Sequence, residues 1–137
     1  MNNCIFCKII NNRSDSYIIT ETDNFLVFLD IHPRSPGHSL VVSKKHYQNL
    51  KETPTELGNE FLSVIKETIL ILNKSLKTSD FTIGINEGPL AGQVIMHLHL
   101  HIIPRFKNDK GGSIHSVVFN KSDLSLEEIY KKIKQCM

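Results

Sequence analysis

Residues 97–103 read HLHLHII, a run in which histidine alternates with apolar residues. Successive side chains of a β-strand point to opposite faces, so His97, His99 and His101 are predicted to share one face. The apolar residues between them would share the other face and become buried. The run therefore predicts a strand with one face in the core and three imidazoles on the other.

Three neighbouring imidazoles can be explained in more than one way. The strand face can simply be solvated, or the three rings can bind zinc, as three histidines do in carbonic anhydrase. Alternatively, the central histidine is a nucleophile, and its neighbours orient it and bind an anion. Residues 86–93, NEGPLAGQ, precede the run and form a glycine-containing loop. Its backbone amides could hold a phosphate, which favours the nucleophile.

Length and composition predict a single domain over residues 1–137. The chain has 137 residues, of which 40% are hydrophobic, enough for one core. Its apolar runs are too short to span a bilayer, and its start lacks the features of a secretory signal. We therefore expect a cytoplasmic protein without a membrane partner. The three cysteines do not form a disulfide framework, and a net charge of +2 with interspersed signs does not indicate a nucleic-acid partner.

The remaining pattern predicts an α+β domain with a mainly antiparallel sheet. Strands are expected over residues 17–20, 24–30, 38–43, 81–86 and 96–103. Thr53 and Pro54 have the character of a helix start, and apolar residues at three-to-four-residue spacing continue that helix through Leu72. Residues 4–12 predict a short helical turn. A final helix is expected to be capped by Ser122 or Asp123.

Several blocks around the histidine run resemble the histidine triad (HIT) family, in its Hint-like, zinc-binding bacterial branch. In chain order they are CIFCKII at 4–10, FLDI at 28–31, PGHSLVV at 36–42, KKH at 44–46, NEG at 86–88 and AGQ at 91–93. With the triad they cover residues 4–105, whereas residues 106–137, a loop and a helix, carry no family motif. The resemblance implies a HIT-like fold with about five antiparallel strands, one long helix and a C-terminal helix.

The resemblance also implies catalysis at the α-phosphate of a purine nucleotide. His99, the middle histidine, would attack the phosphorus and form a nucleotidyl-histidine intermediate, which water then hydrolyses. His101 and His38 would act on the phosphate beside it. The nucleophile must be a neutral imidazole, so activity is expected to fall as the pH drops below about 6.5.

A nucleotide pocket follows from the same resemblance. Asp30 would accept hydrogen bonds from the two ribose hydroxyls, although an aspartate before His32 and Pro33 is also typical of a turn. Asn86 and Gln93 would contact the phosphate or ribose. The apolar residues that would line the purine pocket, each of which could also be plain core, are Ile5, Phe6, Ile9, Phe28 and Ile31.

One residue departs from the family pattern. Hint-like proteins usually have a serine directly after the Gly-Gln pair, where this chain has Val94. Valine cannot donate a proton or a hydrogen bond to a leaving group. The difference favours substrates whose leaving group needs little protonation, such as acyl adenylates or nucleoside polyphosphates.

Cys4 and Cys7 have the two-residue spacing with which a pair of thiolates binds one zinc ion. A redox pair and two buried free thiols are the alternatives. The resemblance adds His46 and His97 as the remaining ligands of a closed, structural Zn²⁺ site, which would tie the N-terminus to the triad. His97 would then be a ligand rather than an acid–base group.

The expected activity is that of a purine nucleoside phosphoramidase or related nucleotidyl hydrolase or transferase, with an AMP- or GMP-type product. The family usually forms homodimers, and the apolar residues within 57–72 would provide a face for one. A dinucleoside polyphosphate hydrolase, a catalytic zinc hydrolase and a nucleotide-binding regulatory module with little turnover are the alternatives.

Overall fold

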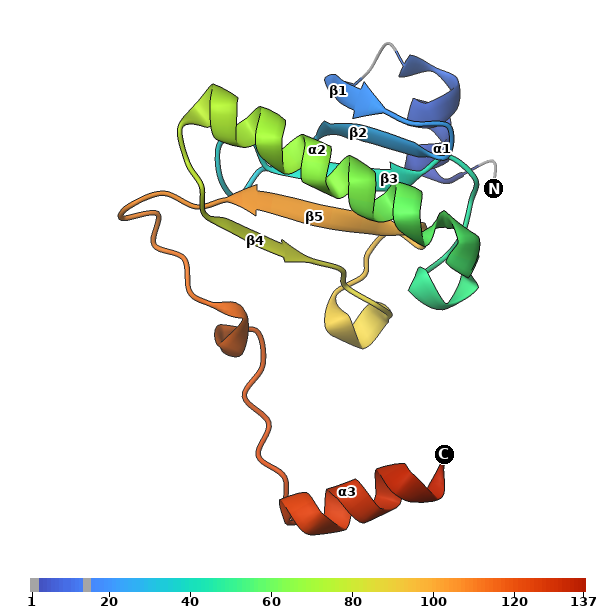
Figure 1. Cartoon of the computed structure of the whole chain (residues 1–137), viewed down its shortest axis with the longest axis vertical. Coiled ribbons are helices and arrows are strands. Elements are labelled where there is room, and N and C mark those ends of the chain that lie inside the picture. The colour runs from blue at the N-terminus through green and yellow to red at the C-terminus, as the bar shows by residue number, and fades with distance from the viewer. Residues whose placement is uncertain (1–2, 14–15) are drawn as a thin grey trace.

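The computed structural model describes residues 3–13 and 16–137, and an antiparallel sheet forms its centre (Figure 1). Five strands pair in the order β1-β2-β3-β5-β4. Their bounds are β1 Ile18–Glu21, β2 Phe25–Leu29, β3 Ser39–Ser43, β4 Phe81–Gly84 and β5 His99–Pro104. Every neighbouring pair is antiparallel, which confirms the predicted α+β class and the five-stranded sheet.

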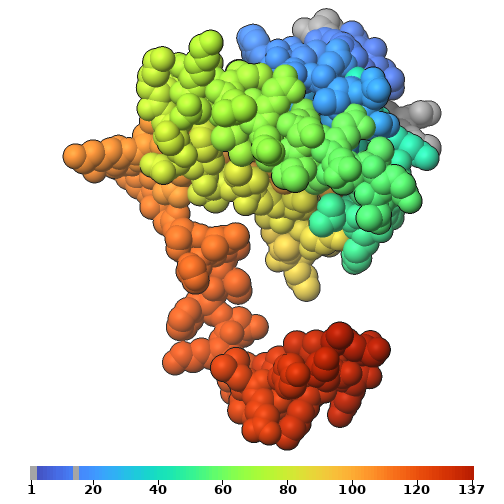
Figure 2. Space-filling view, viewed as in Figure 1, coloured from blue at the N-terminus to red at the C-terminus, as the bar shows by residue number. Residues whose placement is uncertain are grey.

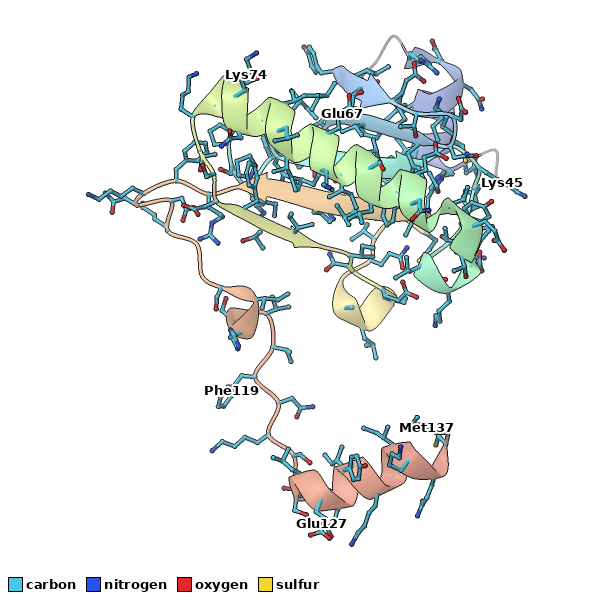
Figure 3. All side chains as sticks on the ribbon, in the orientation of Figure 1. Lys45, Glu67, Lys74, Phe119, Glu127 and Met137 are labelled. Carbon is cyan, nitrogen blue, oxygen red and sulfur yellow. The ribbon has the colours of Figure 1, made fainter. Side chains whose placement is uncertain are left out.

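Within the described residues, three α-helices accompany the sheet: α1 (Ile5–Asn11), α2 (Gly58–Leu76) and α3 (Leu126–Gln135). Figure 1 shows α2 lying along one face of the sheet and α1 beside β2. Figure 3 shows Lys74 projecting from the far end of α2 away from the sheet. The helix therefore presents its polar side outward and its apolar side to the strands, as its spacing predicts.

The central strands are covered on both faces, which explains their continuous apolar sequences. Phe25 and Val27 pack with Val64 and Leu72 of α2. The alternate residues of β2 and β3 pack with Phe6 of α1 in a second cluster. Burying each such side chain contributes roughly 1.5–3 kcal/mol, so the two clusters fix both the register of β2 and the docking of α1.

The long helix begins later than predicted. Thr53 ends one short 3₁₀ turn and Pro54 precedes a second, so α2 begins only at Gly58. The missing amide of Pro54 suits the start of that 3₁₀ turn, which explains the misplaced boundary. The helix ends at Leu76, where Lys77 adopts a left-handed φ of 57° and donates its amide to the Asn73 carbonyl.

The last strand also begins later than predicted, at His99 rather than residue 96. The amide of His97 donates to the Ile95 carbonyl in a tight turn, so His97 precedes β5. Its ring nevertheless lies on the same side of the sheet, because Phe6 contacts the rings of both His97 and His99 edge-on. The intervening apolar residues are buried, as predicted: Leu98, Leu100 and Ile102.

The C-terminal helix is capped by Ser125, so the predicted caps Ser122 and Asp123 are wrong. The Ser125 hydroxyl accepts from the Glu128 amide, and the Glu128 carboxylate accepts from the Ser125 amide, a reciprocal pair that outcompetes a single cap. Figure 2 shows α3 standing apart from the sheet at the end of an extended segment, from which Phe119 projects in Figure 3. Among the described residues, no helix is long and apolar enough to cross a membrane.

Candidate active site

A pocket of about 1460 Å³ lies on the sheet face opposite α2. Its floor crosses the sheet from Phe28 of β2 through His99 and His101 of β5 to Thr82 of β4. His38, just before β3, lies beside them. The sheet order thus places the histidines in the middle of the floor, with α1 and β2 on one side and β4 on the other.

The ring of His99 is held in one tautomer. Its Nδ1 lies 2.7 Å from the backbone carbonyl oxygen of His97. A carbonyl oxygen only accepts, so Nδ1 carries the proton and Nε2 keeps its lone pair. Within the described part of the chain Nε2 has no hydrogen-bond partner, and the 8% exposed ring lines the pocket. The chain therefore presents a basic imidazole nitrogen at the pocket floor.

His38 and His101 form a directed pair. The Arg34 amide donates to Nδ1 of His38 at 3.1 Å, so a neutral His38 carries its proton on Nε2. That nitrogen lies 2.9 Å from Nδ1 of His101 and donates to it. His101 must then carry its own proton on Nε2. The two β5 histidines consequently differ, since His99 offers a lone pair and His101 an N–H.

Burial favours the neutral form of both paired rings. Burial lowers the pKa of His101 to about 4, and the neighbouring His99 and His38 act in the same direction. Burial also lowers the pKa of His38, although the nearby Asp30 carboxylate opposes this. Neutral rings preserve the donor–acceptor chain described above. The arrangement is therefore intact at neutral pH.

The two carboxylate oxygens of Asp30 make different contacts. Oδ1 accepts from the His32 amide at 2.8 Å, which is the turn role anticipated from the sequence. Oδ2 lies 3.6 Å from Nε2 of His38, and Asp30 is one of the residues that line the pocket. All five predicted purine-pocket residues line the pocket, some as partly exposed side chains and some as core: Ile5, Phe6, Ile9, Phe28 and Ile31.

Asn86 and Gln93 lie in different environments. Asn86 lines the pocket. Gln93, which is only 5% exposed, is not among the described residues of the pocket wall. Its Oε1 accepts from the Gly88 amide, and its Nε2 donates to the Gln48 and Ile95 carbonyls. The Gln93 side chain thus fastens the loop that carries Gly88, rather than reaching into the pocket.

Cys4, Cys7, His46 and His97 come together in one cluster, with their ligand atoms all within 4.8 Å of one another. Nδ1 of His97 lies 3.3 Å from Sγ of Cys4 and 3.6 Å from Sγ of Cys7. Nδ1 of His46 lies 3.2 Å from Sγ of Cys7. Tetrahedral bonds of about 2.3 Å to sulfur and 2.0 Å to nitrogen would set these pairs roughly 3.6 Å apart. The donor set therefore fits a tetrahedral metal ion.

The surroundings of the cluster also suit a metal. Nε2 of the fully buried His97 lies 2.7 Å from the Ser43 carbonyl oxygen and donates its N–H to it, which leaves the Nδ1 lone pair for a metal. Burial, with Cys4 beside it, raises the pKa of the Cys7 thiol, an effect that a bound cation would counteract. Sequence reasoning did not anticipate Ser43, Arg34 or the His97 carbonyl as partners, because backbone groups leave no signal in a sequence.

A family model described as "HIT domain" matches residues 11–108 of the chain. The chain belongs to the HIT family. An uncharacterized HIT-like protein of Methanocaldococcus jannaschii is 41% identical over 135 residues, covering 96% of this chain and 98% of that protein. Adenylylsulfatase HINT3 of Arabidopsis thaliana is 41% identical over 79% of this chain and 55% of its own length. Adenosine 5'-monophosphoramidase HNT1 of Saccharomyces cerevisiae is 32% identical over 95% of this chain and 80% of its own.

Solved HIT structures share the fold. A HIT family member from Bacillus subtilis superposes with a TM-score of 0.83 at 30% identity, covering 98% of this chain and 94% of that one. A Zn-bound histidine triad protein from Mycobacterium smegmatis superposes with a TM-score of 0.73 at 29% identity, covering 99% of both chains. The HIT fold predicted from the sequence is thereby confirmed.

Proposed function

We propose that this HIT protein cleaves purine nucleoside phosphoramidates and acyl adenylates at the α-phosphorus, through a nucleotidyl intermediate on His99. The observation that carries the proposal is the difference between the two β5 histidines. His99 presents a lone pair at Nε2, because its Nδ1 proton is bound by a carbonyl oxygen. His101 presents an N–H, because its Nδ1 accepts from His38. A nucleophile and a donor on one pocket floor suit attack on a phosphate.

The reaction would proceed in two steps. The His99 Nε2 lone pair forms a bond to the α-phosphorus, and the bond from phosphorus to the leaving group breaks with its electron pair. The leaving group takes up a proton from the solvent, while the neutral His101 donates a hydrogen bond from Nε2 to the phosphate. A water molecule then attacks the phosphorus, the bond to Nε2 breaks, and the water's proton is released. The products are a nucleoside monophosphate and a His99 restored to its starting tautomer.

The nucleoside would occupy the side of the pocket formed by α1 and β2. Oδ2 of Asp30 would accept from the ribose hydroxyls, while Oδ1 stays engaged with the His32 amide. Asn86, which follows β4, would donate to the phosphate or ribose from the side of the pocket opposite α1 and β2. Ile9, Phe28 and the other apolar residues of that side would enclose the base. Two relatives bear names that fit this assignment, the adenylylsulfatase and the adenosine 5'-monophosphoramidase.

We further propose that the Cys4–Cys7–His46–His97 cluster holds one structural Zn²⁺. The donor distances support the assignment, and so does the existence of the zinc-bound relative. When bound, zinc would cross-link α1 to the start of β5 and contribute to folding stability. His97 would keep its backbone carbonyl on His99 while its ring binds the metal. A reducing cytoplasm, which we propose as the location, would keep both thiols available.

A trapping experiment tests the catalytic proposal. The protein is incubated with adenosine 5'-phosphoramidate, quenched and analysed by peptide mass spectrometry. We expect an adenylyl adduct on His99 and loss of turnover in His99→Gly. His115→Gln, an exposed histidine outside the pocket wall, is the control and should turn over normally. Full turnover by His99→Gly would refute the mechanism. Tight AMP binding without adduct or turnover would instead indicate a regulatory module.

We also propose a homodimer built from the single domain of residues 1–137. Most of the apolar side of α2 packs against the sheet, but the side chains of Leu62 and Leu70 remain 58% and 68% exposed. Analytical ultracentrifugation of the wild type and of Leu62→Glu tests this assignment. A wild type that sediments as a monomer at micromolar concentration would contradict it.

A further inference from the structure

A second pocket, of about 440 Å³, lies beside the cluster of cysteines and histidines. Cys4 and His46 line this second pocket, whereas Cys7 lines the pocket that contains His99. Val94, which lines both pockets, is 89% exposed, and both cysteines are partly exposed. A small solute can therefore approach the pair of thiols without unfolding of the chain.

The two cysteines are placed to form a disulfide. Cys4 directly precedes α1 with an extended backbone, and its carbonyl accepts from the Lys8 amide at 3.1 Å. Cys7 lies in the first turn of the helix, and residues three apart face the same side. Their sulfur atoms lie within 4.8 Å of each other. Cysteine pairs with this spacing at the start of a helix alternate between dithiol and disulfide in oxidoreductases.

His97 connects the cysteine pair to His99 through its ring and its backbone. The ring donates from Nε2 to the Ser43 carbonyl, so Nδ1 carries a lone pair. This lone pair faces Sγ of Cys4 at 3.3 Å and Sγ of Cys7 at 3.6 Å. The His97 carbonyl oxygen in turn accepts the Nδ1 proton of His99 at 2.7 Å. One residue thus contacts both the sulfurs and the nucleophile.

A disulfide would leave Nδ1 of His97 without a partner. Thiols present an S–H donor to this nitrogen, and thiolates share a metal ion with it, but a disulfide does neither. Among the described residues, Nδ1 has no other hydrogen-bond partner, and the ring is fully buried. Because an unpaired buried acceptor costs free energy, the ring would shift. The His97 carbonyl would shift with it and hold the His99 proton less well.

We propose that Cys4 and Cys7 are a site of reversible oxidation by hydroperoxides, which releases the metal and, through His97, slows attack by His99. The inference rests on the proposed function for its catalytic consequence, and on the proposed zinc site for the metal. His97 acts as a positioning residue, because it holds His99 and does not itself contact the substrate. The pair of cysteines would thus lower nucleotide turnover under oxidative conditions.

The oxidation proceeds in two balanced steps. Sγ of Cys4 attacks one oxygen of the hydroperoxide, the O–O bond breaks, and an alcohol leaves, which gives a sulfenic acid. Sγ of Cys7 then attacks that sulfur, the S–S bond forms and water leaves. Overall, the two thiols lose two hydrogen atoms, and the hydroperoxide is reduced to an alcohol and water. A dithiol reductant reverses the oxidation by exchange.

The first part of the test treats zinc-loaded wild-type protein with hydrogen peroxide. Peptide mass spectrometry should show a Cys4–Cys7 disulfide, lighter than the dithiol by two hydrogen atoms. A chromogenic chelator should report the release of about one zinc ion per chain. Dithiothreitol with added zinc should restore the starting protein. Cys136→Ser, which removes an exposed cysteine of the C-terminal segment, is the matched control and should respond as the wild type does.

The second part of the test follows His99 in the same samples. NMR of the imidazole nitrogens should show His99 protonated at Nδ1 in the reduced protein, and this signal should change on oxidation. The rate of adenylylation of His99 should fall at least about tenfold on oxidation and recover on reduction. Reduced protein stripped of zinc should lose less, because its thiols still donate to Nδ1 of His97. Circular dichroism should stay unchanged, which separates a local shift from unfolding.

Three results would overturn the proposal. The first is oxidation confined to Cys136, or oxidation of Cys4 to a sulfinic acid without a disulfide. The second is a Cys4–Cys7 disulfide that changes neither the tautomer of His99 nor its adenylylation rate. The third is loss of the rate through general unfolding. If no adduct forms on His99 even in reduced protein, the proposed function fails instead, while the disulfide, the zinc release and the tautomer still report on the cysteine pair.

Discussion

Replacing His101 with glutamine should make the free energy of unfolding less sensitive to acid. In the folded protein, burial lowers the pKa of His101 to about 4. In the unfolded chain the same ring titrates near 6.5. Between these two values the unfolded chain binds the proton more readily, so stability present above about pH 6.5 is lost as the pH falls toward 4.

The magnitude follows from proton linkage. At pH 5, two pKa values of about 6.5 and 4 correspond to a loss of roughly 2 kcal/mol of unfolding free energy. His101 is only partly buried, so solvent screens part of this effect. We therefore expect the ring to contribute about 1 kcal/mol to the acid sensitivity of the wild type.

Urea unfolding at about pH 7.5 and about pH 5 measures the effect in the wild type and in His101→Gln. Titrating groups that do not contact His101, including the cysteines, contribute equally to both proteins and cancel in the difference. The glutamine carbonyl can still accept from Nε2 of His38, so the replacement removes the titration and keeps the contact. If the wild type lost no more stability than the variant on acidification, the reasoning from burial would be refuted.

Three further predictions concern the metal cluster, the core and the ribose contact. Zinc analysis of protein purified without chelator should give about one ion per chain in the wild type and little in Cys7→Ser. The variant should also unfold at a lower temperature than the wild type. A wild-type protein free of metal would contradict this prediction. Phe6→Ala should lower the free energy of unfolding in urea by about 3 kcal/mol, since the ring packs against Phe28 and His99; a loss below about 1 kcal/mol would mean that α1 is not docked. Asp30→Asn should reduce the kcat/KM preference for ribose over 2'-deoxyribose substrates by about tenfold, and an unchanged preference would remove Asp30 from the ribose site.

The elements that the sequence predicted best are those with a strict period. The alternation after residue 97 correctly predicted buried Leu98, Leu100 and Ile102, because only one face of the strand is apolar. Helix boundaries were predicted less well, since Ser122 and Asp123 are both competent caps. Ser125 is the cap because Glu128, three residues further on, completes a reciprocal hydrogen-bond pair.

The cluster of cysteines and histidines illustrates a different limit. The spacing of Cys4 and Cys7 is visible locally, but His46 and His97 lie 39 and 90 residues from Cys7. Their approach depends on the docking of α1, which Phe6 secures through the second apolar cluster. Family resemblance predicted that these residues meet, and the folded chain brings their ligand atoms within 4.8 Å.

By itself, the sequence determined the chemistry that is available: imidazoles in register, a cysteine pair and an apolar sheet with a long helix. Tertiary structure decided which nitrogen of each imidazole carries a proton, because that depends on the His97 carbonyl and the Arg34 amide. It also decided that Gln93 fastens a loop and that Gly84 lies opposite His101 with open space beside it. Backbone groups and empty space have no residue type of their own, so only the folded chain reveals them.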